Sequence, residues 1–102
     1  MMQRVTIDRH IISALLPDIV GHDRSPSAFI VYLFLACSAS GRRRQVKASL
    51  QSIADDTGLS KSAVQGALRL LLRRRLLRQE RASPTAVPVY DVLRPWARLR
   101  RA

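Results

Sequence analysis

The apolar positions near the start of the chain predict a short helix. Isoleucines and leucines between residues 11 and 19 recur at helical spacing and form a single apolar stripe. Asp8 can cap this helix, and Pro17 is expected to limit it or end it near residue 16, because proline disrupts a helix interior. Residues 4–7 alternate between polar and apolar and indicate a short strand, whereas residues 20–25 read as a linker.

A second apolar segment predicts a buried central helix over residues 26–38. Ser25 followed by Pro26 is a strong start signal, since the hydroxyl can cap the first turn and proline suits the first helical position. The helix is apolar on nearly every side, so its neighbours are expected to bury it. Gly41 is expected to end it. Its longest apolar run, residues 28–37, is too short to span a bilayer, which needs about 20 residues.

Two shorter helical patterns follow around a glycine turn. Ser49 can cap a helix that ends at residue 56 or 57, and Ser60 can cap a helix from residue 61 to about residue 74. Ala54 provides the small side chain that two steeply crossing helices need at their contact. Gly58 allows the positive φ that the three-residue turn needs. This spacing is typical of a helix-turn-helix motif.

Three strand patterns surround this motif. Residues 45–48 precede it, and residues 76–80 and 86–92 follow it as two strands joined by a polar turn. Pro88 indicates an edge strand, because proline cannot donate a hydrogen bond to a ladder. The sequence therefore predicts a mainly α fold with a small β part (class α+β), in which a three-helix core carries a two- or three-stranded antiparallel sheet.

The chain is strongly basic, and its charge is concentrated toward the C-terminal end. It has 102 residues, about the size of one small domain, with 18 Lys and Arg against 7 Asp and Glu, a net charge of +11. Residues 1–41 are neutral overall, whereas residues 69–102 hold ten arginines against two acids, a net of +8. The first part is therefore interpreted as scaffold, and the last part as a contact surface for a polyanionic partner.

The segment "IADDTGLSKSAVQGALRLLLRRRLL" resembles the winged helix-turn-helix of bacterial, phage and plasmid regulators, which typically read IA-x-x-x-G-L-S-x-x-x-V before a run ending in Leu-Leu or Leu-Ile. The likeness covers residues 45–92. It implies that the second motif helix lies in the major groove of DNA and that the strands after it form the wing. One departure is that these proteins usually place glycine where Arg75 stands. The opening "RVTIDRHIISALL" and the later "SPSAFIVYLFL" also resemble the start of replication-initiator DNA-binding domains.

The outward face of the second motif helix supplies the candidate base-reading residues. Glutamine suits adenine, arginine and lysine suit guanine, and a mid-helix glycine permits close approach to a partner. These residues are Lys61, Ser62, Gln65, Gly66 and Arg69. The alternative stays open that the two polar residues in this set are merely solvated and that the glycine is merely tolerated.

A second group is expected to contact DNA phosphates, which supply affinity without sequence information. Its arginines lie before the motif, at the end of the second helix and around the wing turn, and its one serine marks a helix N-terminus fit to hold a phosphate. The group is Ser49, Arg42, Arg43, Arg44, Arg73, Arg78 and Arg81. Arg74 and Arg75 have the alternative role of complementing the negative end of a helix.

The residues that could support other chemistry are few. The sequence contains neither a nucleophile–base set nor a phosphate-cradling glycine loop, so we expect no catalysis and no cofactor. His10 and His22 have no matching ligand residues near them in sequence, so we expect no metal site. Cys37 is the single cysteine, and it is interpreted as a small buried apolar residue.

We therefore expect one winged helix-turn-helix domain over residues 1–102, with an N-terminal extension at 1–24, the motif at 49–75, the wing at 76–93 and a basic tail at 94–102. Its expected function is sequence-preferring binding of double-stranded DNA in a small transcriptional regulator, in the cytoplasm and without a membrane or small-molecule partner. A homodimer is expected, with residues 5–19 as the candidate dimer element, because one short helix reads few base pairs. The alternatives are an origin-binding replication or plasmid partition domain, and an RNA- or protein-interaction module.

Overall fold

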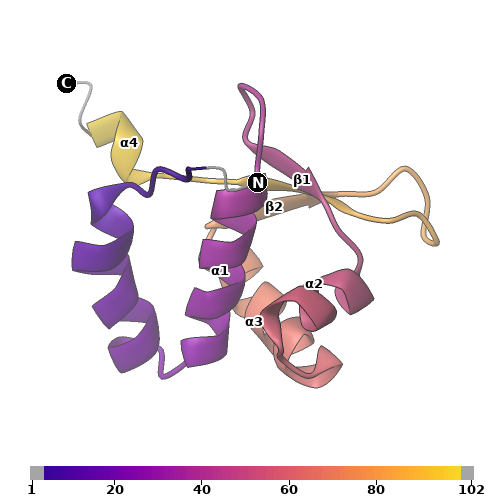
Figure 1. Ribbon diagram of the computed structural model, residues 1–102, viewed down its shortest axis with the longest axis horizontal. Coiled ribbons are helices and arrows are strands. Elements are labelled where there is room, and N and C mark those ends of the chain that lie inside the picture. Colours follow the sequence, from indigo (N-terminus) through magenta and orange to yellow (C-terminus); the bar gives the residue numbers. More distant parts are fainter. Residues whose placement is uncertain (1–3, 100–102) are drawn as a thin grey trace.

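The structure, a computed structural model, describes residues 4–99 and packs its main helices against one face of a small sheet (Figure 1). The N-terminal helix, residues 9–22, stands beside α1, and α2 and α3 lie on the other side of α1. In chain order the elements are η1 (Ile11–Leu15), η2 (Asp18–His22), α1 (Pro26–Ser38), β1 (Gln45–Lys47), α2 (Leu50–Thr57), α3 (Lys61–Arg73), β2 (Leu77–Glu80), β3 (Val89–Val92) and α4 (Trp96–Leu99). The predicted fold class, mainly helical with a three-stranded antiparallel sheet, is confirmed.

Helix α1 is the centre of the core and has the predicted bounds. The Ser25 hydroxyl accepts a hydrogen bond from the Ala28 N–H at 3.2 Å, and Pro26 opens the helix. Its inward side chains are fully buried among the N-terminal helix, α3 and the sheet. The prediction that Gly41 ends the helix is wrong, because the chain already turns extended at Ala39. Gly41, with φ +78°, instead opens the turn at residues 41–44.

The N-terminal helix is longer than its sequence predicts. It continues through Pro17 to His22, so the predicted end near residue 16 is wrong, and so is the first half of the predicted linker, residues 20–22. The hydrogen bonds on both sides of the proline are of the wide π type, which span five residues rather than four. The wider turn relieves the conflict between the proline ring and the preceding carbonyls. Residues 4–7 form no strand, since the sheet contains only β1, β3 and β2.

The sheet places β3 in the centre, with β1 and β2 antiparallel on either side. The edge position that Pro88 suggested is therefore wrong. Pro88 lies just before the first ladder residue, so its missing N–H removes no ladder bond, and its carbonyl accepts from the Ala48 N–H at 3.2 Å. Tyr90 faces the helices, whereas Asp91 faces the opposite side of the sheet, as strand alternation requires.

The C-terminal part of the described chain packs back on the start of the N-terminal helix. Trp96 is 7% exposed, stacks on the His10 ring at 4.5 Å and donates its indole N–H to Asp8 at 3.1 Å. The Tyr32 hydroxyl donates to the Leu93 carbonyl at 2.9 Å and ties α1 to the same region. Residues 96–99 of the predicted basic tail are thus a helical turn, α4, and residues 100–102 lie outside the described residues.

An arginine fastens the end of α3 to the N-terminal helix. Arg74 donates to Asp18 at 2.5 Å and to Asp23 through its other terminal nitrogen. Burial by itself raises the pKa of Asp23, but the hydrogen bond with His22 and the charge and hydrogen bond of Arg74 together lower it below its ordinary value of 3.8. The sequence left Arg74 either in the phosphate-contacting run or beside the negative end of α3. The structure shows a different role, because Arg74 forms an ion pair between α3 and the N-terminal helix.

Replacing Asp23 with asparagine should weaken this attachment and flatten the response of the fold to acid. A carboxylate with a lowered folded pKa stabilises the protein above the unfolded value of 3.8, and that contribution is lost as the pH falls through the folded value. We expect Asp23→Asn to lose about 1 kcal/mol of unfolding free energy near neutral pH. Urea denaturation at about pH 6 and about pH 2.5 measures the free energy of unfolding. This free energy should fall less between the two pH values for the variant than for the natural chain.

The control is Asp56→Asn, which changes an exposed carboxylate on α2. This variant should follow the natural chain at both pH values. If Asp23→Asn and Asp56→Asn are equally sensitive to acid, the ion pair does not stabilise the fold.

Candidate nucleic-acid interface

Local capping and turn geometry build the helix-turn-helix as predicted. The Ser49 hydroxyl accepts from the Ser52 N–H at 3.0 Å to begin α2, and the Ser60 hydroxyl accepts from the Ala63 N–H at 3.0 Å to begin α3. Gly58 has φ +81° and reverses the chain between the two helices. Any residue with a side chain would be strained at this φ. The predicted capping residues and turn are confirmed.

Helix α3 buries one face and exposes the other. Its inward side chains Val64, Ala67, Leu68 and Leu71 are at most 8% exposed. The candidate base-reading residues lie on the opposite side, where Lys61, Ser62, Gln65 and Arg69 are exposed and Gly66 is half-buried. The N-terminal helix, residues 9–22, lies across α1 from α3 (Figure 1), so this helix does not cover the exposed α3 face.

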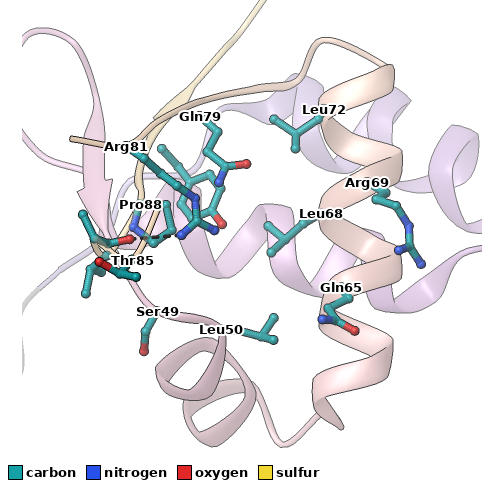
Figure 2. Close-up of a pocket in the computed structure, with 13 residues that line it drawn as sticks. Ser49, Leu50, Gln65, Leu68, Arg69, Leu72, Gln79, Arg81, Thr85 and Pro88 are labelled. Atoms are coloured by element: carbon teal, nitrogen blue, oxygen red, sulfur yellow. Dashed lines mark hydrogen bonds between the residues drawn. The ribbon is translucent and has the colours of Figure 1, made fainter. Parts of the chain in front are cut away.

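A groove of about 400 Å³ separates α3 from the hairpin formed by β2, β3 and their connecting loop (Figure 2). Leu68 and Leu72 of α3 point into it, and Gln79 and Arg81 enter it from the hairpin. Its floor is apolar, and its rim carries polar and charged groups. The lining residues are Ser49, Leu50, Gln65, Leu68, Arg69, Leu72, Gln79, Arg81, Thr85, Ala86, Val87, Pro88 and Tyr90. The structure therefore brings four predicted site residues to one groove: Ser49, Gln65, Arg69 and Arg81.

Arg81 is held in a defined orientation in this groove. Its guanidinium donates to the Ala86 carbonyl at 3.0 Å across the hairpin loop (Figure 2). With the Gln79 amide oriented so that its oxygen faces the guanidinium, that oxygen accepts from Nε of Arg81 at 2.9 Å. A cation fixed in this way is presented at the groove without further loss of side-chain freedom.

Two predicted phosphate-contacting arginines lie elsewhere. Arg43 and Arg78 are on the outer face of the sheet, 3.6 Å and 3.4 Å from the Asp91 carboxylate. Arg43 also pairs with Glu80 at 3.5 Å, and the Gln45 amide donates to Asp91 at 2.7 Å. Asp91 is 3% exposed, and these groups compensate its buried charge on the side of the sheet away from the groove, while Oδ2 accepts no hydrogen bond among the described residues.

The other predicted phosphate contacts are also dispersed. The turn at residues 41–44 lies away from α2 and α3 (Figure 1), and the Arg44 side chain lines a small pocket with Leu33 and Cys37 of α1. Arg44 is half-buried with a positive φ of 51°, and its carbonyl accepts from the Val92 N–H at 3.0 Å. Arg73 is exposed on the last turn of α3. Of the arginines proposed for phosphates, Arg73 and Arg81 are the two on or beside the α3 face.

Gln79 is the groove residue that the sequence prediction missed. Strand alternation would have found it, because residues 77, 79 and 81 share one face of β2 and residue 78 points to the other. The same rule separates Arg78 from Arg81, which the sequence interpretation had grouped together.

Comparison with known protein families supports a specific class for this architecture. Residues 39–81 match the IclR helix-turn-helix domain, a winged helix-turn-helix family, and span the motif from before β1 to the end of β2. The chain therefore carries a winged helix-turn-helix DNA-binding domain of the kind found in transcriptional regulators. It is a DNA-binding transcriptional regulator, and the matched family is not an enzyme family. The match does not favour the origin-binding alternative.

Two further findings concern relatives and membrane spans. They give no significant match among curated proteins or among solved structures. Within residues 4–99, no helix has the length and apolar character needed to cross a membrane.

The position of Arg81 in the groove predicts its effect on binding of one short duplex. For the natural chain we expect affinity to fall with salt, with a log–log slope of about −0.9 for each phosphate contact. Arg81→Ala should weaken all sequences alike and reduce the magnitude of this slope by about 0.9, because one phosphate contact is lost. Arg24→Ala is the control, since it removes an exposed arginine in the loop before α1, away from the groove. Fluorescence anisotropy over a salt series measures both.

Two results would count against this assignment. One is an equal loss for both variants, and the other is a flat salt response of the natural chain. If Arg81→Ala changes the order of preferred sequences, the hairpin reads bases rather than phosphates.

Proposed function

We propose that the exposed face of α3 contacts base edges in the major groove of DNA. The β2–β3 hairpin contacts the phosphate backbone beside them. The observation that carries this proposal is the groove that joins Gln65 and Arg69 of α3 to Arg81 of the hairpin. Gln65 suits adenine and Arg69 suits guanine, because each can form paired hydrogen bonds with that base. Lys61 and Ser62 begin the same face, at the end of α3 that has no covering element among the described residues.

Gly66 has a defined part in this arrangement. It lies on α3 between Gln65 and Ala67, and a Cβ atom added there would meet no other atom of the chain within 4 Å. Packing within the protein therefore does not explain a residue that costs a helix about 1 kcal/mol relative to alanine. Close approach of α3 to the duplex explains it.

The phosphate contacts of this proposal are fewer than the sequence suggests. Arg81 and Arg73 flank the reading face, and Ser49, which lines the groove, lies at the start of α2. The first-turn N–H groups of α2 add donors at that point. Arg43 and Arg78 are excluded from this set because they pair with Asp91 on the other face of the sheet. With DNA as partner, we place the protein in the cytoplasm, at the nucleoid.

Selection from a random duplex library tests the reading face directly. The natural chain should enrich a defined sequence. Arg69→Ala should bind that sequence with about 1–3 kcal/mol less binding free energy and should be less selective at one base pair. The matched control is Arg24→Ala, which removes an exposed arginine in the loop before α1 and should leave the selected sequence unchanged. An unaltered sequence profile for Arg69→Ala removes Arg69 from the reading face.

We also propose that the protein acts as a homodimer through its N-terminal segment. Three side chains of the expected apolar stripe, Ile11, Leu15 and Ile19, are buried in the chain's own core. The apolar side chains of the segment that stay exposed are Val5, Ile7 and Ile12, which are 54%, 41% and 48% exposed. Since one short reading helix covers few base pairs, two copies would supply the second half-site.

Ile12→Arg should separate the two copies without unfolding either one, because Ile12 is exposed in the single chain. Sedimentation equilibrium should give a dimer for the natural chain and a monomer for the variant, with the same circular dichroism spectrum. Val87→Arg, which adds the same charge at an exposed apolar residue near the hairpin, should stay dimeric. The dimer proposal fails if the natural chain is monomeric both free and on its selected site, or if Ile12→Arg remains a dimer.

A further inference from the structure

We infer that the outer face of the sheet carries a second binding site for the phosphodiester backbone of DNA, centred on Arg75. Arg75 lines a hollow of about 480 Å³ together with Arg78, Leu93, Arg94 and Pro95. Its side chain is exposed, and within residues 4–99 it forms no hydrogen bond or ion pair. This site is distinct from the groove beside α3.

The backbone conformation at Arg75 indicates that the arginine side chain does not stabilise the fold. Arg75 links α3 to β2 with φ +57°, in the left-handed region that glycine occupies without strain. Because the guanidinium has no partner in the described chain, no internal contact explains the strained arginine. Backbone strain that internal contacts do not explain is a pointer to function.

The neighbouring arginines are oriented toward the same hollow by the protein itself. Arg78 lies on the outer face because Leu77 is buried on the inner one, and its Nε is 3.4 Å from the Asp91 carboxylate. Arg94 lies 3.7 Å from the Asp8 carboxylate. Each pair uses one side of a guanidinium and leaves other N–H groups available. The side chain of Arg78 is still 62% exposed. Guanidinium groups held in this way suit the tetrahedral oxygens of a phosphate.

The composition of the outer face favours nucleic acid over a protein partner. Four basic side chains, Arg43, Lys47, Arg75 and Arg78, lie on or beside it against the two acids Glu80 and Asp91. None of the large apolar side chains exposed within residues 4–99 belongs to this face, because they are Val5, Ile7, Ile12, Ile30 and Val87. A protein interface ordinarily needs such apolar anchors, whereas a phosphate backbone needs only cations and donors.

The position of the site identifies which DNA it would hold. Figure 1 shows α1, α2 and α3 on one side of the sheet, and Arg78 points to the other side. A straight duplex that lies against α3 does not reach the outer face. The second site therefore binds a separate stretch of duplex, and one protein molecule can connect two DNA segments.

Energy transfer between two short duplexes labelled with a donor and an acceptor tests this inference on the full chain. The natural protein should bring the two duplexes together. Arg75→Gly should reduce binding of the second duplex and make its log–log salt slope shallower by about 0.9, as expected for one lost phosphate contact. Its melting temperature should be unchanged or higher, because glycine relieves the positive φ. Affinity for the first duplex should stay the same.

Arg24→Gly is the matched control. Arg24 is also an exposed arginine with positive φ, 54°, but it lies in the loop between η2 and α1, at the end of α1 away from the sheet (Figure 1). It should gain the same relief of strain and keep full binding of the second duplex. Since neither variant changes α3 or the N-terminal segment, the comparison also separates this site from bridging by the two reading helices of a dimer.

Three results would overturn the inference. The natural chain could bind a single duplex only, or Arg75→Gly could bridge duplexes as well as the natural chain does. Displacement of the second duplex by polyglutamate at concentrations where an unlabelled duplex has no effect would indicate an acidic protein partner instead. The sequence preference of Arg69→Ala tests only the reading face of α3. The proposal of a reading face and the proposal of a second duplex site can therefore be contradicted separately.

Discussion

The burial of α1 on several sides is the constraint on which the rest of the structure depends. Val31, Tyr32 and Leu35 have no exposed surface, and each large side chain buried in this way stabilises the fold by about 1.5–3 kcal/mol. The N-terminal helix, α3 and β3 all pack on α1, so displacing any of them would expose it to water. Because Val64 and Leu71 fix one face of α3 against this core, Gln65 and Arg69 must face outward.

The end of α3 sets the position of the hairpin relative to the reading face. Arg74 holds this end to Asp18 and Asp23, and the left-handed Arg75 then turns the chain into β2. The hairpin that follows this turn lines the groove with Arg81. The geometry that matters for DNA is thus maintained by contacts remote from it, which is usual for sites that must be rigid before the partner arrives.

The net charge of +11 overstates how many cations are available at one surface. Arg43, Arg74, Arg78 and Arg94 all lie in ion pairs within the chain. Summed charge describes the attraction of the whole molecule for a polyanion, whereas contact depends on which side of the sheet each side chain occupies. Arg69 and Arg81 lie at the α3 groove, whereas Arg43 and Arg78 lie on the outer face of the sheet, so these cations belong to two different surfaces.

The sequence by itself determined the features that depend on neighbouring residues. Ser25, Ser49 and Ser60 as caps and Gly58 as the turn follow from local hydrogen bonding and φ preference, so the central helix and the motif could be predicted nearly to the residue. Only the tertiary structure decided the continuation of the helix through Pro17, the central place of β3 and the pairing of Arg78 with Asp91. Each of these depends on atoms far apart in the chain, and residue spacing carries no information about which distant groups will meet.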